Sequence, residues 1–180
     1  MRFFFLATIV AAGAWLPPQG STAARRPDVI FVATEDEVAD AMLSLAKVGP
    51  TDVLYDLGCG DGKLVITAAR RFGTRGVGID IDPQRIREAN ANARAAGVAD
   101  KVRFVEGDIF DSAVTFADAT VVTLYLLTEL NLRLRPRLLA ELAPGTRIVS
   151  NSFSMGDWLA ERVVQVKNFT IYFWTVPPRR

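Results

Sequence analysis

Residues 52–62 read DVLYDLGCGDG, an apolar run that ends in three closely spaced glycines. The apolar residues after this run recur at helical spacing as far as Gly73. A second apolar run at 76–81 precedes Asp82 and Pro83, which are typical of the first positions of a helix, and Gly97 ends that helix. The order therefore predicts a buried strand, a glycine turn, a helix, a second strand and a second helix.

The flanking sequence extends this pattern in both directions. Before it, Thr34 and Glu37 form a capping box at the start of a helix expected over about 35–47. After it we expect strands at 102–105, 120–127 and 146–150, a helix at about 128–142 that Pro136 must kink or restart, and a hairpin of 163–166 with 170–176. These elements predict an α/β fold with a Rossmann-like, doubly wound, mostly parallel sheet and a C-terminal antiparallel hairpin.

Composition limits the function. The chain has 180 residues, of which 50% are hydrophobic, so we expect one globular domain. Lys and Arg number 21 and Asp and Glu 20, and a net charge of +1 argues against nucleic acid as a partner. There is one cysteine and no histidine, which excludes an intramolecular disulfide, zinc sites built from these residues and Ser-His nucleophiles, and we expect no metal.

The first 23 residues differ from the rest of the chain. Arg2 precedes the apolar run 3–16, which is shorter than the ~20 residues of a membrane-spanning helix, and the small residues Ser21 and Ala23 fit a cleavage site. We predict a signal peptide or membrane anchor at 1–23 and a catalytic domain at 24–180, exported or attached to a membrane through residues 3–16. The alternative is a start-site artefact that precedes a cytoplasmic enzyme.

Acidic residues end three successive predicted strands. Asp56 precedes the glycine turn, Asp80 ends the second strand at the spacing of a ribose ligand, and Asp108 is placed to bind an adenine amino group. A dinucleotide-binding turn needs a small residue at the position of Lys63, and carboxylates would repel a pyrophosphate. The pattern favours an adenosine that carries positive charge, although a tight turn needs glycine in any case.

The stretch from Phe31 to Trp158 resembles the class I S-adenosylmethionine-dependent methyltransferases, through DLGCGDG, GVGIDID and EGDIF. It is similar in particular to the small prokaryotic protein-lysine methyltransferases related to the mitochondrial enzymes that methylate the ATP synthase c subunit. The segments that carry this similarity are FVATEDEVADAMLSLAKV, VLYDLGCGDGKLVITAA, VVTLYLLTELNLRLRP and LAPGTRIVSNSF.

The resemblance implies S-adenosylmethionine as cofactor and assigns its ligands. Asp56, Gly58 and Gly60 would hold the methionine part, Asp80 the ribose and Asp108 the adenine. Phe31 and Thr34 would belong to an arm that closes over the cofactor. The chain departs from the family pattern at Phe31 and Ala33, which replace Tyr and Pro, and at Asn151 and Ser152, which replace His and an acidic residue.

The acceptor implied by the resemblance is a lysine of a protein substrate, bound by a monomeric enzyme. A small-molecule methyltransferase and a non-catalytic module that binds the cofactor remain alternatives. Tyr125 follows the fourth strand, where this fold admits its acceptor, so we expect it to be catalytic, with Glu129 and Asn151 around it. The structural alternative for Tyr125 is a place in the hydrophobic core, which is about as common for an aromatic residue at this position. The alternative for Glu129 is a favourable charge at the start of a helix.

Two further interpretations concern structure alone. We expect Cys59 to be packed within the turn, without a redox role. Arg133, Arg135 and Arg137 are expected to form a solvated face, since side chains at alternate positions do not share one side of a helix.

Overall fold

The computed structural model describes residues 32–179. Its centre is a seven-stranded sheet with the order β3-β2-β1-β4-β5-β7-β6. The strands are β1 (Val53–Leu57), β2 (Arg75–Asp80), β3 (Val102–Glu106), β4 (Val121–Leu124), β5 (Arg147–Asn151), β6 (Arg162–Val166) and β7 (Phe169–Thr175). The first five run parallel, whereas β7 pairs antiparallel with both β5 and β6. The predicted doubly wound sheet with a C-terminal hairpin is confirmed.

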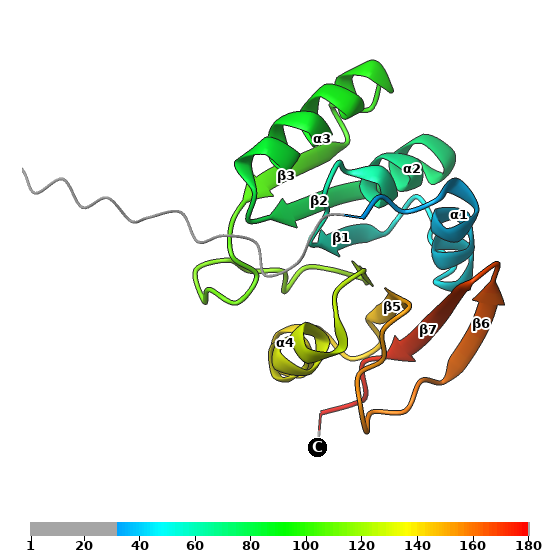
Figure 1. Ribbon diagram of the computed structural model, residues 1–180. Coiled ribbons are helices and arrows are strands. Elements are labelled where there is room, and N and C mark those ends of the chain that lie inside the picture. The colour runs from blue at the N-terminus through cyan, green and yellow to red at the C-terminus, as the bar shows by residue number, and fades with distance from the viewer. Residues whose placement is uncertain (1–31, 180) are drawn as a thin grey trace, which may run out of the picture.

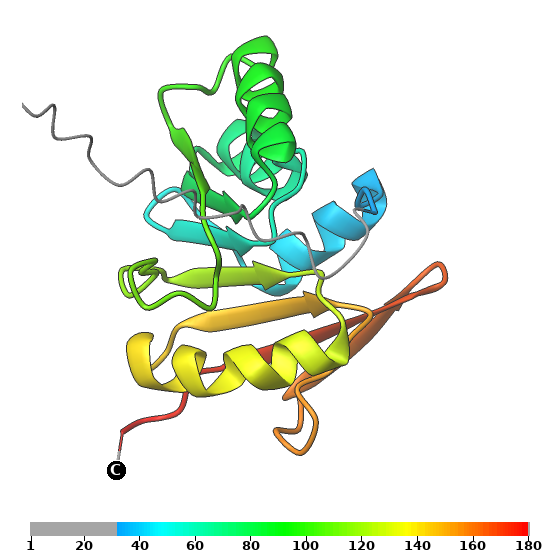
Figure 2. The ribbon, with the colours of Figure 1, turned by 60° about the vertical axis from the view of Figure 1, so that its left-hand side comes forward.

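Helices cover both faces of the sheet, as Figures 1 and 2 show. On one face α1 (Asp36–Leu45), α2 (Lys63–Phe72) and α3 (Pro83–Ala95) contribute buried apolar residues to a single core. On the other face α4 (Thr128–Glu141) and the segment 109–119 pack into a second core around Trp174. The two cores explain why the central strands are almost continuously apolar, because each strand is buried on both sides.

The strand order reverses beside β1. From β1 the chain proceeds outward through β2 and β3, and then returns to add β4 and β5 on the other side. The carboxyl ends of β1 and β4 therefore flank a crevice at the edge of the sheet, which is where open α/β folds bind ligands.

Four local predictions are revised or confirmed by the structure. The capping box is wrong, because the residue before α1 is Glu35, which makes no side-chain capping bond, and Thr34 lies outside the helix. Strand β4 ends at Leu124 rather than at residue 127, since the chain turns there to begin α4, which continues through Pro136 as one helix. The Asp82 cap is confirmed by a 2.8 Å bond that Gln84 N donates to its Oδ1.

The expectation of a solvated arginine face is right for Arg133, which is exposed, and wrong for Arg135 and Arg137, which are half-buried. Arg137 donates to the carbonyl oxygens of Ile109, Asp111 and Val114 over 2.5 to 3.0 Å, and the Arg133 guanidinium lies 3.8 Å from the centre of the Phe110 ring. Arg135 points elsewhere and donates to the carbonyl of Met155 over 2.8 Å. Arg135 thus diverges from Arg133 and Arg137, which lie four residues apart on one side of the helix and both reach the segment after β3.

The predicted N-terminal segment at 1–23 and Phe31 lie outside the residues that the structure describes. Within residues 32–179, no helix is both long enough and apolar enough to cross a membrane.

Candidate active site

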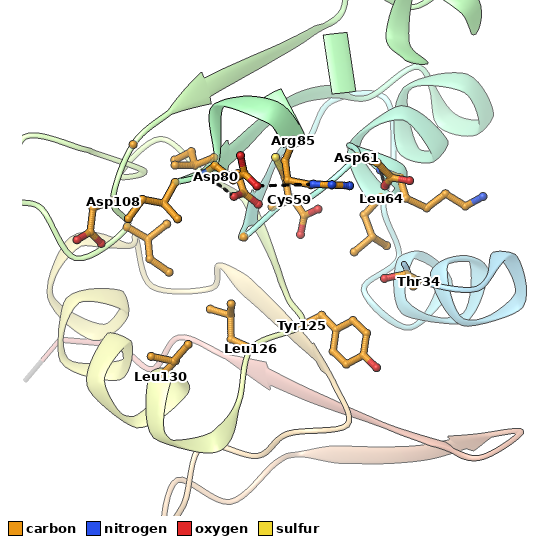
Figure 3. Close-up of a pocket in the computed structure, with 18 of the residues that line it drawn as sticks. Thr34, Cys59, Asp61, Leu64, Asp80, Arg85, Asp108, Tyr125, Leu126 and Leu130 are labelled. Carbon is orange, nitrogen blue, oxygen red and sulfur yellow. Dashed lines mark hydrogen bonds and ion pairs between the residues drawn. The ribbon is translucent and has the colours of Figure 1, made fainter. Parts of the chain in front are cut away.

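A cleft opens at the carboxyl edge of the sheet, with an empty volume of about 1020 Å³ that includes space open to solvent. Its walls come from the arm before α1, the turn after β1, the ends of β2 and β4, and the segment after β3. Figure 3 shows Asp108 at one end of the cleft, Asp80 and Cys59 near the middle, and Thr34 and Leu64 at the other end. The structure thus brings together the strand-end acids Asp56, Asp80 and Asp108 with Gly58 and Thr34. Gly60 is not among the lining residues, and Phe31 lies outside the described residues.

The turn between β1 and α2 combines three glycines with Cys59 and Asp61, which line the cleft. Gly58 and Gly62 have φ angles of 87° and 83°, which favour glycine. A Cβ on Gly58 would lie 2.9 Å from Leu126 Cδ2, and one on Gly62 would lie 2.7 Å from the Phe104 ring. The turn is held against β2 by Gly58 N and Cys59 N, which both donate to the carbonyl of Ile79 over 2.8 and 3.0 Å. The packing and backbone conformation of the turn therefore require glycine at both positions.

The Asp80 carboxylate is oriented by the main chain at the end of β2. Its two oxygens accept hydrogen bonds from Gly60 N at 2.8 Å and from Asp82 N at 3.0 Å. Asp108 is fixed in a similar way, since its Oδ1 accepts a 2.8 Å bond from Phe110 N. Both side chains line the cleft. Carboxylates held in this way can accept further bonds from a ligand's hydroxyl or amino groups without reorganising.

Asp56 is the buried acid of the site, with only 4% of its surface exposed. Its Oδ1 accepts a 2.8 Å hydrogen bond from Thr123 Oγ1 on the neighbouring strand β4. Burial raises the pKa of Asp56 to about 7, Thr123 opposes that shift, and the charges of Asp80 and Asp61 add to it. The site thus holds a carboxyl group that a cationic ligand would help to ionise.

The composition of the cleft fits the predicted cofactor. Five carboxylates line it, from Asp56, Asp61, Asp80, Asp82 and Asp108, whereas Lys63 and Arg85 are the cations among the described lining residues. This excess of negative charge suits a ligand that carries an ammonium and a sulfonium, and it would repel a pyrophosphate. Cys59 is buried in the turn, where burial and the neighbouring carboxylates raise the pKa of its thiol. The thiol is thereby kept protonated, as its predicted packing role requires.

The acceptor side is less complete than we expected. Tyr125 is half-buried, lines the cleft, and has its ring centre 6.2 Å from that of Phe153. Glu129 and Asn151 are not among the lining residues: Glu129 is exposed, and Asn151 is fully buried at the end of β5. Ser152 Oγ donates a 2.9 Å bond to Asn151 Oδ1.

Several contributions to the cleft do not follow from the sequence pattern. In the sequence Lys63 stands out only as a departure from a dinucleotide motif, yet it lines the cleft directly after the glycine turn. Phe110 and Leu126 also line it, and both are apolar residues that simple periodicity assigns to core. The sequence could still have indicated Lys63, because a cation at the first position of a helix interacts unfavourably with the helix dipole. A lysine at such a position is therefore a candidate for a functional role.

The fold, the glycine turn and the row of strand-end acids define a class I S-adenosylmethionine-dependent methyltransferase. Residues 56–162 match the ANTKMT methyltransferase domain, and the chain belongs to that family.

Individual relatives agree with this assignment. The chain is 43% identical over 155 residues to a protein-lysine N-methyltransferase of Saccharolobus islandicus, a match that spans 83% of this chain and 95% of that protein. It is 29% identical over 184 residues to the mouse lysine N-methyltransferase named for the c subunit of ATP synthase, covering 98% and 72% of the two chains. A crystal structure described as an RNA methyltransferase from Salinibacter ruber in complex with S-adenosyl-L-homocysteine superposes with a TM-score of 0.80 and 52% identity. That match covers 83% of this chain and 96% of the other.

Proposed function

We propose that this methyltransferase transfers the methyl group of S-adenosylmethionine to a lysine side chain of a protein. The observation that carries the proposal is Tyr125, an aromatic residue that lines the cleft at the end of β4, one strand away from the buried acid Asp56. Leu126 and Leu130 line the cleft with Tyr125, and an aromatic face beside apolar residues suits an aliphatic amine in its charged or neutral form. The lysine specificity of the relatives supports the same acceptor.

Methyl transfer to an amine requires a correctly oriented acceptor more than it requires acid or base groups of the protein. The cofactor supplies a methyl group on a positively charged sulfur, which is a good leaving group. A lysine must lose its proton before it can attack. The apolar residues beside Tyr125 and the positive sulfonium lower the pKa of a lysine that enters the cleft, against the opposing effect of the carboxylates that line it. Tyr125, together with the Phe153 ring behind it, would hold the amine in line, and the proton can pass to water. The absence of histidine is compatible with this route.

Transfer of labelled methyl groups tests the proposal. Residues 24–180 are incubated with S-adenosylmethionine labelled in its methyl group and with a protein extract, followed by hydrolysis of the protein fraction. We expect the label in methyl-lysine, and a Tyr125→Ala variant is expected to give much less of it. Label that is removed by ribonuclease but not by protease would assign the acceptor to RNA, the activity ascribed to the Salinibacter relative.

Different acceptors give different results in the same experiment. Label found only in small metabolites would indicate a small-molecule methyltransferase. Cofactor binding without transfer to any acceptor would indicate a non-catalytic module. The near-zero net charge of +1 disfavours RNA, because binding to phosphates depends on clustered Lys and Arg.

We also propose that residues 1–23 direct the chain to a membrane or for export, and that residues 24–180 act as a monomeric catalytic domain. The apolar run 3–16 after Arg2 supports this division. Fractionation of cells that express the full chain, with mass determination of the product, separates the outcomes. A chain that starts after Ala23 indicates a cleaved signal, an intact membrane-bound chain indicates an anchor, and an intact cytoplasmic chain overturns the proposal.

A further inference from the structure

The order of the acidic residues along the cleft indicates which part of the cofactor would lie where. Asp108 follows β3, Asp80 ends β2 and Asp56 lies in β1, and these three strands are neighbours in the sheet. With adenine near Asp108 and ribose near Asp80, the amino-acid end of the cofactor reaches the end of β1. That end carries an ammonium and a carboxylate on the same carbon atom. Asp56 can attract the ammonium, but a carboxylate needs a cation or an N–H donor.

Two cations line the described cleft, and they lie at different ends of it. Arg85 belongs to α3, the helix that follows β2, where it pairs with Glu88 at 2.6 Å and lies 3.8 Å from Asp82. It is therefore on the ribose side. Lys63 is the first residue of α2 and follows the glycine turn directly, so it is at the amino-acid end. Figure 3 shows its neighbour Leu64 at the same end of the cleft as Thr34, away from Asp108.

In the structure Lys63 forms an ion pair with Asp36 at the start of α1. The hydrogen bond and the charge of Lys63 lower the pKa of Asp36. The Asp36 side chain is 82% exposed, whereas that of Lys63 is 36% exposed. Exposed ion pairs contribute little stability, because water solvates both partners well when they separate. Lys63 can thus exchange this partner for another anion at small cost, and Asp36 remains hydrated when it does.

We propose that Lys63 binds the carboxylate of the methionine part of the cofactor, in exchange for its contact with Asp36. Asp56 and Lys63 would then recognise the two charges of the amino-acid end with two charges of opposite sign. This assignment does not depend on the identity of the methyl acceptor. It also accounts for a lysine at a helical position that disfavours positive charge.

Binding of two ligands by titration calorimetry tests the proposal. S-adenosylhomocysteine contains the amino-acid end, whereas 5′-methylthioadenosine lacks both its ammonium and its carboxylate. Lys63→Met should weaken binding of S-adenosylhomocysteine about tenfold or more and leave that of methylthioadenosine unchanged. Lys63→Arg should retain most of the affinity, because it keeps the charge. Lys167→Met is the matched control: Lys167 pairs with Glu35 and Glu37 near the start of α1 at 2.9 and 3.0 Å but does not line the cleft.

The Asp36→Asn variant distinguishes two roles of Lys63: direct binding of the cofactor, and a purely structural role in holding α1. If Lys63 acts only by holding α1 through Asp36, this variant should lose as much affinity for S-adenosylhomocysteine as Lys63→Met does, which would overturn the proposal. We expect instead that its affinity is unchanged or higher, because Lys63 is released. Equal losses for both ligands in Lys63→Met, or no loss for either, would also overturn it. Failure of the parent protein to bind either ligand would count against the cofactor site as a whole, which is a different result.

Discussion

Thr123 donates a 2.8 Å hydrogen bond from its Oγ1 to Oδ1 of Asp56, and the two residues lie side by side in the register of β4 and β1. Both are buried in the centre of the sheet. The bond favours the ionised carboxylate, yet the pKa of Asp56 still rises to about 7 because burial outweighs it. Asp56, the acid expected to hold the methionine part, therefore keeps its proton to a higher pH than an exposed carboxyl group does.

Cofactor affinity should fall as the pH drops below about 7. Only ionised Asp56 attracts the cofactor's ammonium, so at lower pH binding must first release a proton. Calorimetry between pH 5.5 and 8, in buffers of different ionisation enthalpy, would measure both the affinity and the protons released. Asp56→Asn should bind weakly throughout and lose this proton release. A constant affinity over the range would show that Asp56 does not contact the charged end.

The same group should make the free protein less stable at high pH. Its folded pKa of about 7 lies above the ordinary value of 3.8, so the folded state retains a proton that the unfolded chain loses. Its contribution to the free energy of unfolding is complete below about pH 4 and is lost as the pH rises through 7.

Asp56→Asn should therefore stabilise the free protein at pH 8, since it keeps an acceptor for Thr123 without the buried charge. A shift of one pKa unit corresponds to about 1.4 kcal/mol, and we expect a gain of at least that size. Denaturant unfolding of both proteins at pH 5 and pH 8 measures it. The difference should be smaller at pH 5, where folded Asp56 still holds its proton, and an Asn variant that is less stable at pH 8 would contradict this account.

Arg137 should support the adenine end of the cleft from outside. It donates to three carbonyl groups of the segment that carries Asp108 and Phe110, and its Nε lies 2.6 Å from Oε1 of Glu141. Arg137→Met removes these bonds, which should cost about 2 to 4 kcal/mol of stability, because each links a charged donor to a partly buried carbonyl. It should also weaken binding of adenosine and of S-adenosylhomocysteine to a similar extent.

Arg135→Met is the control for this prediction. Arg135 belongs to the same helix but bonds to Met155 and Asp157, away from the adenine segment. Its loss is expected to lower stability and to leave adenosine affinity unchanged. Equal effects of the two variants on adenosine binding would indicate that α4 acts as a whole, and not through Arg137.

The positions of the acids and glycines of the site were predictable because the order of the strands determines where they lie. Asp56 and Asp80 lie in parallel strands, and Gly58 follows the first, so their meeting at one edge follows from the alternation of strands and helices. The conformations of Thr34 and Lys63 were not predictable in this way. Thr34 and Glu37 have the spacing of a capping box, but the helix begins one residue later than the box requires, and Thr34 faces the cleft instead.

The contacts that side chains make with loops distant in the sequence could not be predicted from hydrophobic periodicity either. The spacing of Arg133 and Arg137 describes only their helix, whereas their partners are carbonyl groups and a ring some twenty or more positions earlier in the chain. Hydrophobic periodicity carries no information about such partners. A polar series on a helix therefore predicts exposure unless the loop that packs against it is known.

Tyr125 should affect turnover far more than cofactor affinity. It lines the cleft at the end of β4, packs near Phe153, and lies outside the row of acids that we expect to face the cofactor. A ring face that holds an ammonium contributes about 0.5 to 2 kcal/mol, and correct alignment of the amine adds to this, so Tyr125→Ala should lower kcat about tenfold or more. Tyr125→Phe should cost less if the ring alone matters. Steady-state rates with calorimetric binding of S-adenosylhomocysteine measure both effects.

Because Tyr125 is only half-buried, thermal unfolding of Tyr125→Ala should stay close to that of the parent. A variant that unfolds, or one that keeps full turnover, would assign Tyr125 to packing and leave the acceptor side without its aromatic residue.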